Sequence, residues 1–225
     1  AAVTTEMPPI PGSVSRRALD LPPPMVREIE IAFGALAGWQ PQRRPFMHGG
    51  GGGPAFGACL GASCTGAGPY INRALSLQSR PLLAALFRAV RHGLRESEVF
   101  PCSSVQVNVD SVAEKHTDSG NQGPSAAIVI GDFSSGGELV CTGSVLDCKA
   151  KVCFFNGLEE HWSLPFAGGS RVSFIIFCHA RARELAGGEL SLLHSLGFRM
   201  EPGLLPYTCS GAGEEAAKAE SALAS

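Results

Sequence analysis

Polar and apolar positions alternate strictly along residues 104–110, and this is the clearest strand signal in the chain. Valines fill one set of alternate positions and polar residues the other, as Val105, Val107 and Val109 against Gln106, Asn108 and Asp110. Successive side chains of a strand point to opposite faces, so the pattern predicts a strand with one apolar face and one polar face. We expect the valines to face packed helices and the polar side chains to face a polar interior.

Short strand-like segments separated by glycine-rich turns continue from this point. They lie at 126–130, 138–142, 151–155, 162–164 and 171–178. Short strands with glycine turns, preceded by helices, are typical of a double-stranded β-helix, or jelly roll. The predicted fold class is therefore α+β, with a jelly-roll core and helices packed on one of its sheets.

The first half of the chain has a different character. Helical spacing of apolar residues predicts helices at 25–36 and 79–96, and the glycine run that begins at Gly49 is expected to lie in a long irregular connection. We divide the chain into four parts: a flexible proline-rich leader (1–25), a helical and glycine-rich part packing on the core (26–103), the jelly-roll core (104–205) and a mobile tail (206–225).

Two histidines and one aspartate form a candidate metal site. His116 and Asp118 are two residues apart, so their side chains leave the same face of a strand, and His161 follows later. Two imidazoles with one carboxylate are the facial triad of non-haem Fe(II) sites, which leaves coordination positions free. The open alternatives are polar residues without a metal, or a jelly roll that holds another divalent metal, as cupins do.

A second pair with the same spacing follows the candidate metal ligands. Arg171 and Ser173 share one face of a strand, where a guanidinium and a hydroxyl could hold a dicarboxylate. An arginine buried beside a neutral pocket is an unpaired charge and therefore requires an anion. Asn108, on the polar face of its strand, is either a further donor to that carboxylate or a purely structural residue.

The ordered set H-x-D…H…R-x-S resembles the 2-oxoglutarate- and Fe(II)-dependent dioxygenases over about residues 104–177. The resemblance implies that His116, Asp118 and His161 bind a catalytic Fe(II), and that Arg171 and Ser173 bind 2-oxoglutarate as co-substrate. It also implies O₂ as a reactant and ascorbate as a candidate reductant. Among the reactions that this superfamily carries out is hydroxylation of a C–H bond.

Within that superfamily, His116-Thr-Asp118-Ser-Gly-Asn121 is similar to the H-x-D-x-x-N signature of the TET/JBP branch. That branch oxidises the methyl group of thymine or 5-methylcytosine in DNA, and the resemblance implies that Asn121 contacts a base edge. The favoured hypothesis is oxidation of a pyrimidine methyl group in nucleic acid. Hydroxylation of a protein side chain, of the prolyl type, and a catalytically silent jelly-roll binding module are the alternatives.

Charge is distributed unevenly although the net charge is only −2. Residues 31–95 contain seven arginines and no Asp or Glu, whereas the rest of the chain from Glu96 is acidic. Such asymmetry favours a polyanionic partner, DNA or RNA, for the basic segment. Three of these arginines, Arg88, Arg91 and Arg95, share a helix face that is either simply solvated or in contact with phosphates.

The other histidines and acidic residues receive structural interpretations. No second ligand lies at a suitable spacing from the histidines His48, His92, His179 and His194. Glu159 and Glu160, just before His161, are read as a solvated turn, with orientation of the His161 ring as the alternative. The 8 cysteines favour buried thiols in a reducing compartment over disulfides. We therefore expect an intracellular protein, nuclear or cytoplasmic, without a membrane partner; the oligomeric state stays open.

Overall fold

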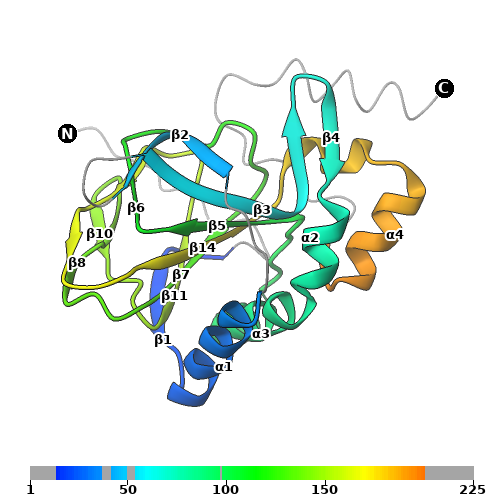
Figure 1. Ribbon diagram of the computed structural model, residues 1–225. Helices are drawn as coiled ribbons and strands as arrows, with labels where there is room; N and C mark the ends of the chain where they lie inside the picture. The colour runs from blue at the N-terminus through cyan, green and yellow to red at the C-terminus, as the bar shows by residue number, and fades with distance from the viewer. Residues whose placement is uncertain (1–13, 37–41, 50–53, 97, 201–225) are drawn as a thin grey trace.

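The computed structural model describes residues 14–36, 42–49, 54–96 and 98–200, and its main feature is one large twisted sheet (Figure 1). Its nine strands include, in spatial order, β1 (Arg17–Asp20), β11 (Lys151–Phe155), β7 (Ser125–Ile130), β14 (Val172–Phe177), β5 (Ser104–Val109), β3 (Pro54–Thr65), β2 (Gln42–Gly49) and β6 (Ser111–Ala113), while β4 (Gly68–Ile71) pairs beside β3. The ladders between these strands are antiparallel.

Two smaller sheets complete the β-structure. One consists of β10 (Ser144–Leu146), β9 (Leu139–Cys141) and β12 (His161–Ser163), and the other pairs β13 (Phe166–Ala167) with β8 (Ser135–Gly136). A small apolar cluster, with Phe133, Leu139 and Phe155 among its buried members, joins these strands to the large sheet. The small sheets therefore cover one face of the large sheet.

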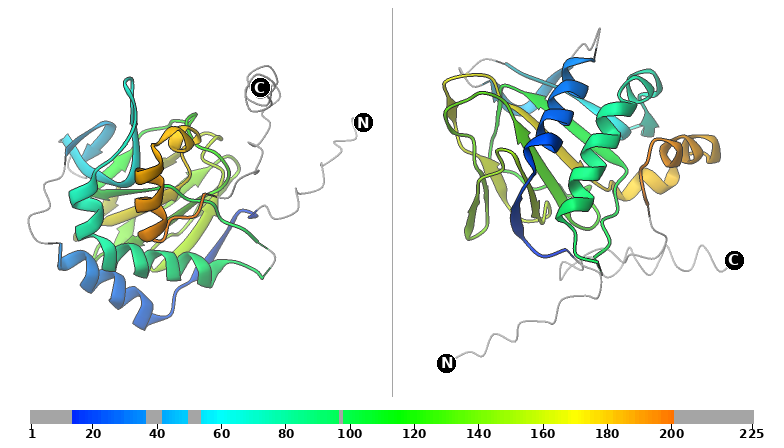
Figure 2. Two further views of the ribbon diagram at one scale, coloured as in Figure 1. Left: turned by 90° about the vertical axis from the view of Figure 1, so that its right-hand side faces the viewer. Right: turned by 90° about the horizontal axis from the view of Figure 1, so that it is seen from below.

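Helices cover the opposite face of the large sheet, as the two views of Figure 2 show for α1 (Pro23–Gly34) and α3 (Arg80–Gly93). Ile29 of α1 and Leu83 of α3 are fully buried in the main core, which also contains Val107, Phe174 and other strand residues. The remaining helices are α2 (Arg73–Gln78), the 3₁₀ helix η1 (Ala180–Glu184) and α4 (Gly187–Ser195). Helices on one sheet of a two-sheet β-structure agree with the prediction from the sequence.

The polar and apolar faces of β5 lie as its alternation predicts. Val105 and Val107 are buried in the helix-side core, and Gln106 and Asn108 face the other way. Asp110 differs, because it follows the strand with a φ of 46° and its carboxylate accepts from the Arg171 backbone N–H at 2.7 Å. Asp110 therefore closes a turn instead of facing the interior.

The glycine-rich region is the largest difference from expectation. The sequence predicts an irregular connection there, but β2 and β3 form a hairpin that extends the large sheet. Gly57 shows why glycine occurs in a strand here, since a Cβ atom at this position would lie 2.3 Å from the backbone oxygen of Val107. The backbones of β3 and β5 approach so closely here that only glycine fits. Because glycines have no side chain, a strand that contains them shows no alternation of polar and apolar residues in the sequence.

The leader is also more ordered than the sequence suggests. Residues 17–20 pair with β11 as an edge strand, and α1 begins at Pro23. The partly buried Arg17 guanidinium forms an ion pair with the Glu98 carboxylate and lies 4.9 Å over the Phe154 ring. These contacts order the second half of the predicted leader, whereas residues 1–13 and the predicted tail lie outside the described residues.

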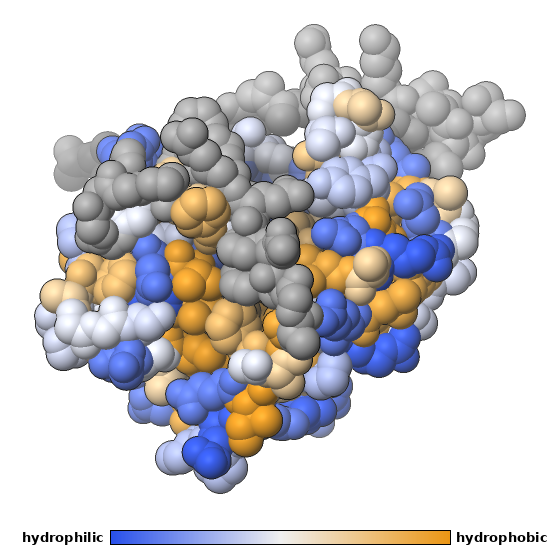
Figure 3. Space-filling view, viewed as in Figure 1, coloured by the Kyte–Doolittle hydropathy of each residue, from blue (hydrophilic) through white to orange (hydrophobic). Residues whose placement is uncertain are grey.

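Apolar residues reach the surface in bands separated by polar residues in the view of Figure 3. The large apolar side chains exposed among the described residues come from six different elements: Leu19, Ile31, Phe56, Tyr70, Leu77 and Val145. Scattered exposed apolar side chains of this kind are normal for a protein surface. No helix in the described part of the chain is long and apolar enough to cross a membrane.

Candidate active site

A cavity of about 250 Å³ lies on the face of the large sheet that the helices do not cover. Alternate residues of three central strands line it: Gln106 and Asn108 of β5, Ala127 and Val129 of β7, and Ser173, Ile175 and Phe177 of β14. Their sequence neighbours, such as Ile128 and Phe174, belong to the helix-side core. The period-2 geometry of the strands thus separates the cavity lining from the packed core.

His116, Asp118 and His161 meet at this cavity, with one ligand atom of each within 4.8 Å of the other two. His116 and His161 form an antiparallel β-bridge: the His116 backbone N–H donates to the His161 oxygen (N to O, 3.0 Å), and the His161 N–H donates to the His116 oxygen (2.9 Å). The Asp118 backbone N–H donates to Gly157 at 2.8 Å, just before the His161 strand. These backbone bonds join two distant parts of the sequence and bring the predicted ligands together.

Each histidine ring is oriented by a backbone carbonyl oxygen. His116 Nδ1 lies 2.6 Å from the oxygen of Glu114, and His161 Nδ1 lies 2.8 Å from the oxygen of Glu159. A carbonyl only accepts, so both Nδ1 atoms carry the proton and both Nε2 atoms are available as ligands. This carbonyl support is typical of histidines that bind metals.

The donor set fits a first-row metal such as Fe(II). His116 Nε2 lies 3.6 Å from Asp118 Oδ1, and His161 Nε2 lies 3.6 Å from Asp118 Oδ2. Nitrogen and oxygen ligands lie roughly 2 Å from such a metal, which places adjacent ligands roughly 3 Å apart. Burial lowers the pKa of His161, but its hydrogen bonds with Asp118 and Glu159 outweigh burial and leave that pKa raised. The structure thus brings the three predicted residues together with suitable atoms facing one another.

Arg171 and Ser173 line the same cavity and are almost fully buried, with 5% and 3% of their surface exposed. Arg171 donates to the backbone oxygens of Ser111 at 3.1 Å and Gly137 at 3.0 Å, while its Nε has no partner among the described residues. No carboxylate of the described residues forms an ion pair with it, and burial lowers its pKa. A buried cation without a counter-ion at a cavity wall is a site for an anionic ligand.

Gly137 makes room for this guanidinium. A Cβ atom on Gly137 would lie 2.9 Å from Arg171 Nε, and the residue has a φ of 80°. Both the conformation and the space therefore favour glycine beside the arginine.

Asn108 lies opposite Ser173 in the β5–β14 ladder and lines the cavity with it. Its Oδ1 accepts from Gln106 Nε2 at 3.2 Å, which fixes the amide orientation. Among the described residues its Nδ2 has no acceptor, so this N–H group is available to a ligand. The predicted contact with a carboxylate stays a prediction, and the geometry allows it.

Asn121 lies behind the metal ligands and is not among the residues that line the cavity. Its Nδ2 is 3.2 Å from Asp118 Oδ2 and 3.4 Å from Ser125 Oγ. Only 9% of the residue surface is exposed. The structure thus gives Asn121 a contact with the candidate metal ligand Asp118, while its predicted contact with a base stays a prediction.

The three arginines of the basic helix face are far from these residues in the architecture. Arg88 and Arg91 lie on α3 and Arg95 follows it, on the side of the large sheet opposite the cavity, and all three are exposed. Arg88 forms an ion pair with Glu28 of α1. The structure does not bring them to the cavity, so any phosphate contact that they make stays a prediction and lies away from the metal ligands.

His179 and Phe177 are cavity residues that sequence reasoning missed. His179 Nδ1 accepts from the backbone N–H of Arg181 at 3.1 Å and lies 3.3 Å from the Cys64 thiol, so the proton is on Nε2. Burial and nearby Arg181 lower the pKa of His179, which favours the neutral ring. The two-residue spacing from Ser173 through Ile175 and Phe177 to His179 could have identified them, because it continues the cavity face of β14.

The described cysteines all carry free thiols, which excludes disulfides among them. Burial raises the pKa of Cys141 to about 11 and that of Cys102 to about 12. These thiols therefore stay protonated and act as small apolar residues. In the described part of the chain, the His116–Asp118–His161 group is the candidate metal site, and no cysteine belongs to it.

No protein-family model matches the chain, and no curated protein sequence matches it. Solved structures do match. An oxidoreductase of the 2OG-Fe(II) oxygenase family from Burkholderia pseudomallei has a TM-score of 0.52 at 18% identity, over 73% of this chain and 88% of its own. NgTET1 in complex with 5mC DNA has a TM-score of 0.47 at 17% identity, over 81% of each chain. A prolyl hydroxylase from Trichoplax adhaerens has a TM-score of 0.49 at 9% identity, over 76% of this chain and 87% of its own.

The likeness to the Burkholderia protein shows the fold. The chain has the jelly-roll fold of the 2OG-Fe(II) oxygenases, which confirms the predicted α+β fold class. On that fold it carries a His-Asp-His group and a buried arginine in one cavity.

Proposed function

We propose that this protein is an Fe(II)- and 2-oxoglutarate-dependent dioxygenase that oxidises the methyl group of a pyrimidine base in nucleic acid. The observation that supports the activity most strongly is the presence, in one cavity, of the His116–Asp118–His161 group and the unpaired Arg171 guanidinium. A metal ligand set alone would suit many reactions. A buried cation beside it selects an anionic co-substrate.

Each residue has a defined task in this proposal. His116, Asp118 and His161 hold Fe(II) through Nε2 and carboxylate oxygens, and Arg171 binds the distal carboxylate of 2-oxoglutarate with the Ser173 hydroxyl. Asn108 Nδ2 is a further donor to the co-substrate. Once loaded, such a site couples decarboxylation of 2-oxoglutarate and reduction of O₂ to hydroxylation of a C–H bond. The protein supplies ligands, orientation and a cavity that limits access of water.

The side chains that line the cavity are suited to binding a neutral, planar part of a substrate. Phe177 offers an apolar ring, and His179 Nε2–H is a neutral donor with no acceptor among the described residues. Aromatic stacking together with a few hydrogen bonds is how proteins hold a base outside the double helix. A cavity of about 250 Å³ is also small, so it suits one base at a time, extruded from its stack.

Part of the basic segment, residues 31–95, lies near the cavity, which favours DNA or RNA as the partner. Strand β2 belongs to that segment and borders the cavity, since its Met47 is one of the lining residues. The α3 arginines are on the other side of the molecule. We therefore place the main phosphate contacts near β2, with a smaller contribution from Arg88, Arg91 and Arg95.

The test is mass spectrometry of nucleosides after incubation of the protein with Fe(II), 2-oxoglutarate, ascorbate and DNA that contains 5-methylcytosine. The proposal predicts an oxidised methyl group that disappears in Asp118→Ala. Hydroxylation of a proline-containing peptide, with DNA left unchanged, would keep the dioxygenase activity and replace the substrate class. A wild type that binds no metal and forms no product from either substrate would leave only a silent binding module.

A further inference from the structure

The N-terminal segment reaches the outer side of the turn that carries His161. Strand β1 is antiparallel to β11, and Arg17 pairs with Phe154. Arg16, one residue earlier, therefore lies at the end of β11, where the chain turns toward β12 and His161. This register brings a residue from the start of the chain next to a candidate metal ligand, although Arg16 and Glu159 are 143 residues apart in sequence.

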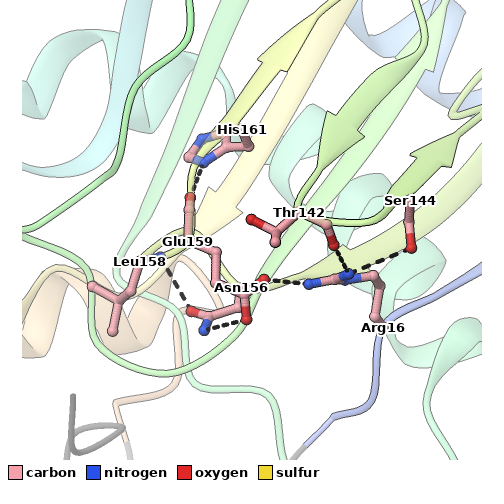
Figure 4. A network of polar contacts seen from close by, with 7 residues as sticks. All are labelled: Arg16, Thr142, Ser144, Asn156, Leu158, Glu159 and His161. Atoms are coloured by element: carbon pink, nitrogen blue, oxygen red, sulfur yellow. Dashed lines mark hydrogen bonds and ion pairs between the residues drawn. The ribbon is translucent and has the colours of Figure 1, made fainter. Parts of the chain in front are cut away.

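Arg16 joins two separate turns at this place, as Figure 4 shows. Its Nη1 donates to the backbone oxygen of Thr142 in the β9–β10 turn at 2.6 Å and reaches Oγ of Ser144, the first residue of β10, at 3.4 Å. Its Nη2 forms an ion pair with the Glu159 carboxylate in the β11–β12 turn. One planar guanidinium, with its fixed fork of donors, thus connects the β9–β10 turn to the β11–β12 turn, at the end of the small sheet where β12 begins.

The turn that carries His161 is braced internally as well. The second carboxylate oxygen of Glu159 accepts from Asn156 Nδ2 at 3.2 Å. Asn156 Oδ1 accepts in turn from the Leu158 backbone N–H at 3.1 Å (Figure 4). Glu159 therefore has both carboxylate oxygens occupied, one by Arg16 and one by its own turn.

The backbone of the same glutamate orients the His161 ring. His161 Nδ1–H donates to the Glu159 carbonyl oxygen at 2.8 Å, which directs Nε2 toward Asp118 in the cavity. The side chain of Glu159 fixes the turn, and its carbonyl fixes the ring. Any displacement of this turn therefore moves the ring of a metal ligand.

We infer that Arg16 is a positioning residue for His161, which acts through Glu159 and contacts neither metal nor substrate. The solvated-turn interpretation of Glu159 is replaced by a structural link from the N-terminal segment to the metal site. This inference rests on the proposed function, because it assigns His161 to a metal. It adds that ordering of residues 14–20 on β11 strengthens metal binding.

The chain offers a matched control in the adjacent residue. Arg17 also forms an ion pair with a glutamate, Glu98, and donates to the Gly93 backbone oxygen at 2.7 Å. Those partners lie at the end of α3 and beyond it, and no described contact joins Arg17 to the 156–161 turn. Arg16 and Arg17 therefore anchor the same segment, but only Arg16 leads to His161.

The experiment is titration of the metal-free full chain with Co(II), a redox-stable probe for the site, followed by its visible absorption, together with thermal unfolding of each variant. Arg16→Gln is expected to weaken Co(II) binding roughly tenfold, the lower end of the effect of outer contacts on metal affinity. In turnover, it should raise the Fe(II) concentration needed for half-maximal rate and leave kcat at saturating Fe(II) unchanged. Arg17→Gln should lower the midpoint of thermal unfolding and leave Co(II) affinity within about twofold, because it touches no ligand support.

Glu159→Gln breaks the same link from the other end and should weaken Co(II) binding like Arg16→Gln; it serves in place of Arg16→Gln if that variant does not fold. Equal Co(II) affinity of the wild type and these variants would overturn the inference while leaving the proposed function intact. Equal loss of affinity in Arg17→Gln would also overturn it, since the effect would then be general. A wild type that binds no Co(II), like His116→Ala, would contradict the proposed function and the inference together.

Discussion

The two faces of the large sheet use the same strands for different purposes. On the helix side, Val105, Ile128 and Phe174 are buried with relative exposures near zero, and they form one apolar core with α1 and α3. On the cavity side, the alternate positions hold Asn108 of β5 and Ser173 of β14, and Arg171 directly precedes β14. Side chains one residue apart thus pack in the core on one face and line the cavity on the other.

The difference between the two faces shows how a small jelly roll can remain stable with a buried, uncompensated charge in its cavity. The cavity face contains a buried charge with no counter-ion among the described residues, and such a group destabilises the free protein. Dense apolar packing on the other face of the same strands offsets that cost. We expect substitutions on the two faces to separate accordingly into effects on folding and effects on ligand binding.

The largest effect should come from the helix face, in Phe174→Ala. Phe174 is completely buried, and removal of its ring should lower the free energy of unfolding by about 3–5 kcal/mol. Denaturant unfolding measures this. The matched variant Ser173→Ala, one residue away, should change stability by less than about 0.5 kcal/mol, because it removes one hydroxyl from the cavity wall. Similar losses in both variants would show that the two faces are not separate.

The next largest effect should be on ligand binding, in Arg171→Met. Loss of the cation should weaken 2-oxoglutarate binding in the presence of Fe(II) by about 2–4 kcal/mol, or roughly 30-fold or more, as measured by calorimetry under anaerobic conditions. Stability of the ligand-free protein should change by no more than about 1 kcal/mol, since removal of an unpaired buried charge offsets two lost hydrogen bonds. Unchanged 2-oxoglutarate affinity would remove Arg171 from the co-substrate site.

Asn121→Ala sharpens the assignment of a residue that lies just behind the cavity. Because its amide bonds the Asp118 carboxylate at 3.2 Å, the variant should weaken Co(II) binding by about tenfold. A residue that only contacts a base would leave Co(II) affinity unchanged and raise KM for DNA. Parallel titration with Co(II) and kinetics with methylated DNA therefore distinguish the two roles.

The smallest effect concerns an ionic contact on the helix side. The hydrogen bond from Arg17 lowers the pKa of Glu98 below its usual value of 4.5, so its stabilisation is full above that pH and is lost as the pH falls through the lower folded-state pKa. Glu98→Gln should therefore reduce stability by up to about 1 kcal/mol at pH 7 and have a smaller effect at pH 3. Urea unfolding at the two pH values checks this, and a larger effect at the acidic pH would contradict a stabilising role of the ionised carboxylate.

Sequence patterns predicted the parts of the protein that local chemistry determines. The alternation of β5 identified both of its faces, and H-x-D…H…R-x-S identified side chains that the structure brings into one cavity. These features were accessible because side-chain direction follows from the period of a strand. The β2–β3 hairpin was missed, since glycines chosen for close backbone contact carry no hydrophobic period.

Long-range pairing was the other part that the sequence could not supply. The place of Arg16 beside the His161 turn depends on the register of β1 against β11, and nothing local in either segment records that register. The contact between His179 Nδ1 and the Cys64 thiol also joins separate elements, and nothing local in either segment predicts it. Positions determined by packing between distant segments need the fold before their roles become visible.

The most direct test of the central claim is succinate formation from 2-oxoglutarate by the full chain with Fe(II), ascorbate and DNA containing 5-methylcytosine, with His116→Ala measured in parallel. We predict succinate production that DNA stimulates and that His116→Ala abolishes. Succinate at equal rates from the wild type and His116→Ala, or none from either with any substrate, would contradict the assignment of this cavity as a dioxygenase site.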